Sequence, residues 1–138
     1  MAVKKQAVNL ERFFQALGDN TRLRLLNLID DKEICVCYFV EILGVPQPKI
    51  SRHLAYLRSA GIVAARREGK WMHYRIATPP DSGAAKVLRQ TVAWLRGNKT
   101  MQGDSARLKK ACCSPVKYAT LEGVPPPKSA QKSCCEIR

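Results

Sequence analysis

The sequence predicts a mainly α-helical fold with one small β-hairpin, the winged helix-turn-helix. Three observations predict it: a cationic amphipathic helix pattern over residues 47–60, two strand-like runs directly after it, and further helix patterns on both sides. The expected order is four helices, two strands and a fifth helix. With 138 residues, of which 46% are apolar, the chain can bury one modest core.

Three helices are expected ahead of the cationic one. The first is closed by Gly18 and has an apolar stripe made of Leu10, Phe13, Phe14 and Leu17. The second follows a candidate N-cap at Asp19 and carries Leu25, Leu26 and Ile29. A third is expected from about Cys35 to Leu43, and it ends at Gly44.

The cationic helix has one side to bury and one side suited to nucleic acid. Ile50, Leu54 and Leu57 recur at i, i+4 and i+7 and form the buried stripe. Side chains that bond to phosphates and base edges lie mostly off that stripe, namely Gln47, Lys49, Ser51, Arg52 and Tyr56. Pro46 and Pro48 bracket the start of the helix, where proline costs least. The sequence leaves open whether His53 contacts DNA or packs beside the stripe.

A basic hairpin is expected next. Residues 62–67 and 70–76 form two runs joined at Glu68-Gly69, a dipeptide compatible with a tight turn. The second run alternates, with Met72, Tyr74 and Ile76 on one face and Trp71, His73 and Arg75 on the other. We expect His73 to pack within the hairpin, because it has no partner at metal-site spacing. A helix followed by a basic two-stranded ribbon is typical of a winged helix.

The charge is concentrated on this helix and hairpin. The chain has 24 Lys and Arg against 11 Asp and Glu, a net charge of +13. Over residues 46–75 the acidic side chain is Glu68, and the basic ones are Lys49, Arg52, Arg58, Arg66, Arg67, Lys70 and Arg75. Because the excess coincides with a recognition-helix pattern, it favours a polyanion partner over a cationic face kept for solubility.

The residues after the hairpin predict a fifth helix and a tail. The helix starts at about Asp81, and one of its sides carries Val87, Leu88, Thr91, Val92 and Leu95. This stripe and that of the first helix exceed what a small core can use, so we expect them to cover one another in a homodimer, with Trp94 in the dimer core. The pattern ends near Met101. We therefore expect a domain over residues 1–100 and a flexible basic tail over residues 101–138.

The chain has no signal-peptide pattern near its start and no run of about 18 apolar residues that could span a membrane. A cytoplasmic protein without a membrane partner is expected, with its six cysteines mostly reduced. The pairs Cys112-Cys113 and Cys134-Cys135 are adjacent, a spacing that disfavours disulfides within a pair. Closely spaced reduced thiols are typical ligands of a soft ion, or redox sensors.

Cys35 and Cys37 are the thiols nearest the cationic helix. Residues i and i+2 of a regular helix point to different sides, so joint binding of one ion requires the start of the third helix to be non-helical. A helix N-terminus would also stabilise the thiolate that binds soft ions. Ligand binding here could displace the following cationic helix. The alternative is that both are ordinary buried cysteines.

Three strings in this order, ICVC, QPKISRHLAYLRSAGIV and REGKWMHYRI, resemble the arsenic-responsive repressors of the ArsR/SmtB family over about residues 7–100. The resemblance implies a homodimeric repressor that binds operator DNA and needs no cofactor. It implies that As(III) or Sb(III) is the inducer and that Cys35 and Cys37 bind it. Members of this type often carry a third cysteine three residues after the second, where this chain has Val40.

The expected site residues follow from these patterns and this resemblance. The candidate metal ligands are Cys35 and Cys37, with Cys112 and Cys113 as further thiols that could complete the site. The candidate DNA-binding residues are Gln47, Pro48, Lys49, Ser51, Arg52, His53, Arg66, Arg67 and Lys70.

The same sequence features are compatible with other functions. A repressor of the same fold could instead sense oxidants or other soft metals, such as Cd, Pb or Bi. An enzyme is not expected, because the sequence has no Gly-rich phosphate loop, no paired Ser and His, and no carboxylate pair in a pocket motif. An arsenical reductase using vicinal thiols is the least implausible catalytic alternative.

Overall fold

The computed structural model describes residues 8–113 and 118–129 of the chain. The first part contains α1 (Leu10–Leu17), α2 (Asn20–Ile29), β1 (Lys32–Cys35), α3 (Val36–Leu43), α4 (Gln47–Ser59), β2 (Val63–Glu68), β3 (Trp71–Ile76) and α5 (Ser82–Leu95). The first part also contains α6 (Lys99–Cys113), and the second contains the 3-10 helix η2 (Ala119–Leu121) and β4 (Lys128–Ser129). The predicted mainly helical winged helix-turn-helix is confirmed.

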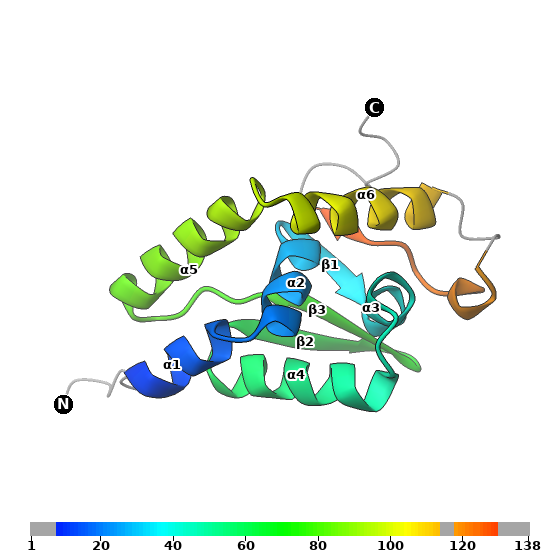
Figure 1. Cartoon of the computed structure of the whole chain (residues 1–138). Coiled ribbons are helices and arrows are strands. Elements are labelled where there is room, and N and C mark those ends of the chain that lie inside the picture. Colours follow the sequence, from blue (N-terminus) through cyan, green and yellow to red (C-terminus); the bar gives the residue numbers. More distant parts are fainter. Residues whose placement is uncertain (1–7, 114–117, 130–138) are drawn as a thin grey trace.

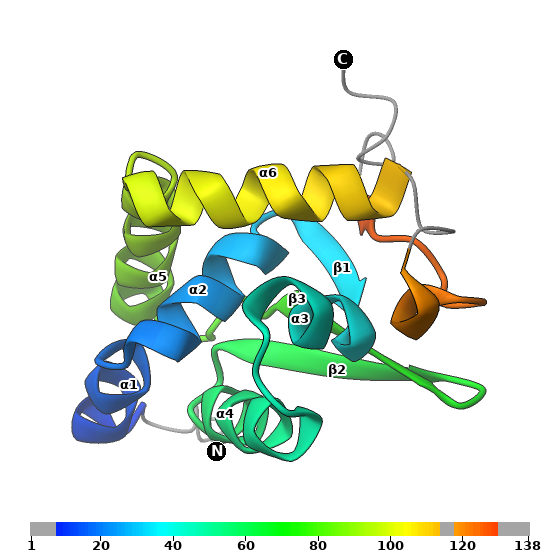
Figure 2. The same cartoon turned by 45° about the vertical axis from the view of Figure 1, so that its right-hand side comes forward.

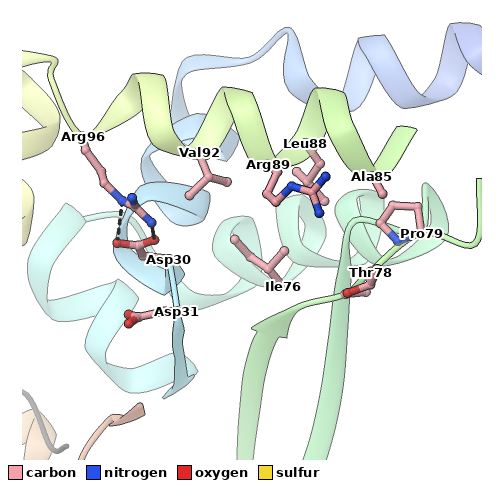
Figure 3. A pocket seen from close by; sticks show the side chains of 11 residues that line it. Asp30, Asp31, Ile76, Thr78, Pro79, Ala85, Leu88, Arg89, Val92 and Arg96 are labelled. Atoms are coloured by element: carbon pink, nitrogen blue, oxygen red, sulfur yellow. Dashed lines mark hydrogen bonds and ion pairs between the residues drawn. The ribbon is translucent and has the colours of Figure 1, made fainter. Parts of the chain in front are cut away.

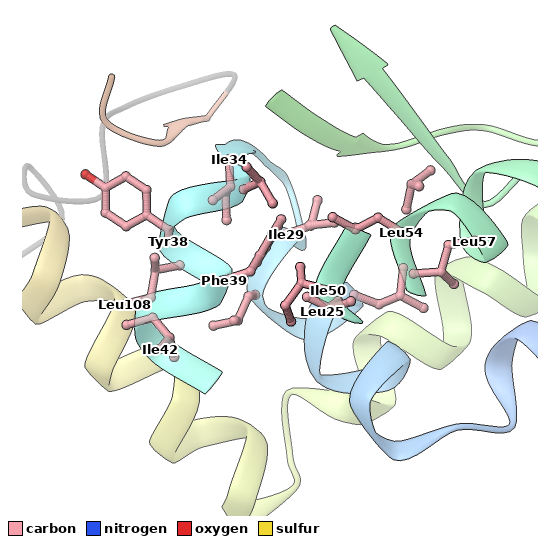
Figure 4. Packing of buried hydrophobic residues seen from close by; sticks show 14 of the residues in the cluster. Leu25, Ile29, Ile34, Tyr38, Phe39, Ile42, Ile50, Leu54, Leu57 and Leu108 are labelled. Atoms are coloured by element: carbon pink, nitrogen blue, oxygen red, sulfur yellow. The ribbon is translucent and has the colours of Figure 1, made fainter. Parts of the chain in front are cut away.

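The core lies between α2, α3, α4 and the sheet. Figures 1 and 2 show α4 along one side of the molecule and α6 along the opposite side, with α2 and α3 between them. Figure 4 shows the packing of buried side chains from these elements, including Leu25, Ile29, Ile34, Phe39 and Leu54, which are fully buried. The stripe expected for α4 is therefore the stripe that anchors it.

Local sequence accounts for most helix boundaries. Oδ1 of Asn9 accepts a hydrogen bond of 3.0 Å from the backbone N–H of Arg12 at the start of α1, and Asp81 caps α5 in the same way. Asp19 is the N-cap residue of α2, as predicted, but its side chain makes no capping bond. Gly44 ends α3 with φ +64°, a conformation that glycine adopts without strain.

The wing is larger than the predicted hairpin. The sheet order is β2-β3-β1-β4, and the sequence did not predict β1 or β4. β1 pairs antiparallel with β3, placing Cys35 opposite His73, and β3 pairs with β2, placing His73 opposite Arg66. The four residues of β1 were too few to show an alternating pattern beside the expected helix.

The segment after residue 100 differs most from expectation. The sequence predicted a flexible tail from residue 101, and the structure instead has α6 packed against α2 and α3. Arg24 donates two hydrogen bonds, of 2.7 and 2.9 Å, to the buried carboxylate of Asp104, and Asn27 donates one of 2.9 Å to the carbonyl of Met101. The expectation of flexibility is therefore wrong for residues 101–113. The division of the chain into two domains near residue 100 stays a prediction.

The reason for this difference is physical. The apolar stripe of α6 is interrupted by a charged residue. Its buried apolar residues are Met101, Leu108, Ala111 and Cys112, and the buried position between Met101 and Leu108 is Asp104. Its remaining anchors are polar groups on α2, about 75–80 residues earlier in the chain. Residues 118–129 add Leu121 and Val124, which are also buried. Cys134 and Cys135 lie outside the described residues.

Candidate functional site

α4 presents an exposed polar surface at its N-terminal half. Ile50, Leu54 and Leu57 are fully buried, and their burial turns the opposite side of the helix outward. That outward side carries the predicted residues Gln47, Pro48, Lys49, Ser51 and Arg52, all of which are exposed. The structure thus places these five predicted residues on one accessible helical surface.

Side chains of α1 and α2 hold α4 in place. Arg22 donates to the carbonyls of Gln15 and Ala16 at the end of α1, both at 2.8 Å, and its guanidinium lies 4.3 Å from the ring centroid of Tyr56. The hydroxyl of Tyr56 donates to Oε1 of Gln15 at 3.0 Å. Arg12 donates to the hydroxyl of Ser59 at 2.9 Å. Sequence reasoning missed this network, because its members are spread over residues 12–59 without a common motif.

His53 is part of that network. Its Nδ1 lies 3.5 Å from Asp19 and 3.3 Å from Arg22, and the side chain is mostly buried. Burial lowers the pKa of His53, and the charges of Arg22, Lys49 and Arg52 lower it further, against the opposing charge of Asp19. The structure thus places His53 in polar contact with Asp19 and Arg22, and a contact between His53 and DNA stays a prediction.

The wing arginines lie in different environments. Arg67 is exposed and donates to the carbonyl of Gly69 at 3.1 Å, and Lys70 is exposed with its Nζ 4.8 Å from the ring centroid of Trp71. Arg66 instead donates to both carboxylate oxygens of Glu33 on β1. This pairing lowers the pKa of Glu33 and raises that of Arg66. Arg66 is therefore ion-paired to another strand, whereas these contacts of Arg67 and Lys70 lie within their own hairpin.

His73 packs inside the wing, as expected. It is 2% exposed, and its Nε2 lies 3.0 Å from Oε1 of Glu68. Among the described residues, no group of three or more His, Cys, Asp or Glu side chains is arranged to hold a metal ion.

Cys35 and Cys37 lie at the junction of β1 and α3. Cys35 is the last residue of β1 and the N-cap of α3, with an extended backbone at φ −69° and ψ 143°, and Cys37 is in the first turn of α3. The two thiols are near enough for Cys35 to raise the pKa of Cys37. The junction is thus non-helical at Cys35, which is the geometry that joint binding by residues i and i+2 requires.

The pKa of Cys37 is higher than the position of this thiol at a helix N-terminus led us to expect. Burial raises the pKa of Cys37 to about 11, and the charge of Cys35 raises it in the same direction. The helix N-terminus was expected to favour thiolate, and that effect is outweighed here. The physical reason is that the apolar surroundings of α3 disfavour a buried negative charge. In this conformation Cys37 is a thiol near neutral pH.

The two cysteines at the end of α6 differ from each other. Cys112 is buried and disulfide-bonded, whereas Cys113 is exposed and free. Cys112 is therefore an exception to the expectation that the cysteines are mostly reduced. The structure brings Cys35 and Cys37 together, and it does not assemble Cys112 or Cys113 with them into a group of three described ligands.

The predicted dimer stripes divide into two sets. The first set is buried within the single chain and belongs to its core: Phe13, Leu88, Val92 and Leu95. Leu10, Phe14, Val87 and Trp94 are exposed, and Trp94 is 82% exposed. In both views α1 and α5 lie at the same end of the molecule. An apolar surface on α1 and α5 is therefore left uncovered by this chain.

A pocket of about 180 Å³ lies between α5 and the end of β3 (Figure 3). Its lining is mainly apolar, with Ile76, Leu88 and Val92, and Arg96 closes one end by a paired hydrogen bond to Asp30. Neither cysteine nor histidine lines it. The pocket is thus separate from the thiol pair and unsuited to a soft ion.

Within the described residues, every helix is too short or too polar to cross a membrane. The exposed basic helix α4, supported by α2 and α3 and followed by a basic hairpin, defines a winged-helix DNA-binding protein.

Comparisons with known proteins give the family. Residues 19–65 match the family described as bacterial regulatory protein, arsR family. The Escherichia coli K12 protein named arsenical resistance operon repressor is 38% identical over 104 residues, covering 75% of this chain and 87% of its own. The Pseudomonas putida arsenic resistance transcriptional regulator ArsR2 is 40% identical over 109 residues, covering 72% and 94%.

A solved structure agrees on the fold. HlyU from Vibrio cholerae N16961 superposes with a TM-score of 0.54 at 23% identity, covering 67% of this chain and 97% of HlyU. The chain belongs to the arsR family of bacterial regulatory proteins. It is a DNA-binding transcription regulator, a class without enzymatic activity.

Proposed function

We propose that this protein is a cytoplasmic repressor that binds operator DNA as a homodimer and releases it when trivalent arsenic or antimony binds Cys35 and Cys37. The observation that carries the proposal is the position of these two thiols at the non-helical junction of β1 and α3, one short helix ahead of α4. The names of the two similar proteins, both concerned with arsenic resistance, support the choice of ligand.

The mechanism follows from the position of α3. Soft thiolates are suitable ligands for As(III) and Sb(III), and binding replaces the thiol protons by bonds to the ion. The bound ion fixes Cys35 and Cys37 at the end of β1 and the start of α3, and α3 packs directly on α4. A conformation that suits the ion but displaces α4 lowers operator affinity, as linkage requires. A third sulfur from Cys112 or Cys113 would first require reduction or rearrangement of α6.

Operator binding is assigned to the exposed cations and amides. The major groove is contacted by four residues of α4, namely Gln47, Lys49, Ser51 and Arg52. The wing binds phosphate or the minor groove through Arg67 and Lys70. A dimer presenting two such surfaces protects half-sites about one helical turn, or ~34 Å, apart. Affinity falls steeply with salt, because phosphate contacts release counterions.

The dimer is assigned to the exposed apolar surface of α1 and α5. Replacing Leu10 and Trp94 by glutamate places charges there without touching the core, because both side chains are exposed. Analytical ultracentrifugation should then show a monomer with weak operator binding. A variant that stays dimeric would place the interface elsewhere.

The test of the inducer site measures the operator-bound fraction against arsenite. The variant with Cys35→Ser and Cys37→Ser should bind operator and keep it bound when arsenite is added. Cys113→Ser is the matched control, because Cys113 is a free but exposed thiol of α6, and it should release as the wild type does. Release by the double serine variant would refute the assignment. X-ray absorption of the arsenite-loaded protein counts the sulfur ligands.

A thiol-based redox regulator is the second candidate. The disulfide of Cys112 and the proximity of Cys35 to Cys37 favour it. Titration with arsenite in parallel with peroxide separates the two, since a redox regulator releases DNA with peroxide and regains it with a dithiol reductant.

A further inference from the structure

Two adjacent wing arginines have unequal surroundings. The guanidinium of Arg66 donates to Glu33 through Nη2 at 2.6 Å and through Nε at 3.0 and 3.1 Å, and its Nη1 lies 3.9 Å from Glu68. Arg67, the next residue, is exposed and bonds within its own turn. A guanidinium that donates to both oxygens of a carboxylate is held in one orientation, because its coplanar N–H groups match the positions of the two oxygens.

The strand register connects Arg66 to the thiol pair. Cys35 on β1 lies opposite His73 on β3, and His73 lies opposite Arg66 on β2. Residues directly opposite one another share a face of the sheet, so Cys35, His73 and Arg66 form one cross-strand row. Glu33 precedes Cys35 by two residues and therefore lies on the same face. The ion pair thus joins the wing to the strand that ends at the thiol site.

We infer that Arg66 is a positioning residue that fixes the wing to β1 through Glu33, so that a ligand on Cys35 and Cys37 moves the wing as well as α4. This inference rests on the proposed function. A change in backbone direction at Cys35 shifts β1 against β3, and Glu33 carries that shift to β2 by its bonds to Arg66. Wing displacement then adds to the loss of operator affinity.

The competing role for Arg66 is a phosphate contact, as the sequence predicted. To bind phosphate, Arg66 must first give up its charge-assisted bonds to Glu33, and Glu33 is then left without its main partner. Arg67 and Lys70 have no such requirement. A phosphate contact and a positioning role through Glu33 therefore predict different operator affinities and arsenite responses for Arg66 variants.

The experiment compares Arg66→Gln, Glu33→Gln, their double variant and the control Arg67→Gln. Two quantities are measured for each: the salt dependence of operator affinity, and the coupling ratio, which is operator affinity without arsenite divided by affinity with it. Arg67→Gln should keep the coupling ratio and reduce the salt slope by about one, because one phosphate is no longer neutralised. Arg66→Gln and Glu33→Gln should keep the slope and reduce the coupling ratio by about three- to ten-fold.

Two further variants test whether the ion pair between Arg66 and Glu33 is itself responsible for the effect. The double variant should be no worse than either single variant, because both remove the same interaction. Arg66→Lys keeps the charge but not the fork, so it should keep the salt slope and still lose coupling. This variant keeps the result interpretable if a neutral side chain disturbs the fold.

The outcomes separate the inference from the proposed function. If the wild type releases with arsenite and the Arg66 and Glu33 variants release equally well, the inference is overturned and the proposed function stands. A reduced salt slope with an unchanged coupling ratio for Arg66→Gln makes Arg66 a phosphate ligand and overturns it as well. A coupling ratio of one for the wild type would mean that arsenite does not change operator affinity. The proposed inducer response and the coupling role of Arg66 would then both be refuted.

Discussion

The helices α4 and α6 lie on opposite sides of the protein and are held by different forces (Figure 1). α4 is anchored by three fully buried aliphatic side chains at helical spacing, and its other side is free for a ligand. α6 has a buried carboxylate, Asp104, within its apolar stripe, and it relies on the bonds of that carboxylate to Arg24 and on the hydrogen bond from Asn27. The comparison shows that a helix with a regular stripe is recognised locally, whereas a helix held by distant polar partners is not.

The largest effect is expected from breaking the polar anchor of α6. Asp104 is fully buried, and Asp104→Ala leaves Arg24 without its bidentate partner. The free energy of unfolding should fall by about 3 kcal/mol, as measured by urea denaturation. Arg107→Ala is the control, because it removes the exposed partner of the same carboxylate and should cost less than about 1 kcal/mol. Equal effects of the two would show that α6 does not depend on the buried pair.

A smaller effect, of a different kind, is expected on α4. Arg52→Ala should weaken operator binding by about 2 kcal/mol, measured by fluorescence anisotropy, and leave the free energy of unfolding unchanged within about 0.5 kcal/mol. Arg58→Ala is the control, since Arg58 is an exposed cation near the other end of α4. Similar losses at both positions would mean that general charge, and not the N-terminal surface of α4, determines affinity.

An effect confined to alkaline pH is expected from α3, which packs against both helices. The pKa of Cys37 is about 11 in the folded protein, above its ordinary value of 9.0. Between about pH 9 and 11 the unfolded chain loses this proton first, so stability should fall as pH rises through that range and be unaffected below it. Cys37→Ser should remove this component from the pH dependence of thermal unfolding. An unchanged profile in the serine variant would assign the alkaline loss to other groups.

Local sequence was sufficient to predict the elements with strong periodicity and the polar chemistry of the exposed side of α4. The stripe of Ile50, Leu54 and Leu57 predicted α4, and the cations beside it predicted a surface that the structure leaves exposed. The spacing of Cys35 and Cys37 allowed their close approach on the condition that the helix start is non-helical, and the structure meets that condition. These features are local, because a helix or hairpin pattern is complete within about a dozen residues.

Which of the predicted residues are free and which are engaged depends on the tertiary structure. Arg66 and Arg67 are identical in type and adjacent in sequence, and a carboxylate 33 residues before Arg66 makes the difference between them. Leu88 and Trp94 belong to the same helix, yet one is buried in the core and the other is exposed. α6 is held in place because Asp104 meets Arg24 across 80 residues. Such partners are chosen by the folded arrangement of the chain, and no local pattern specifies them.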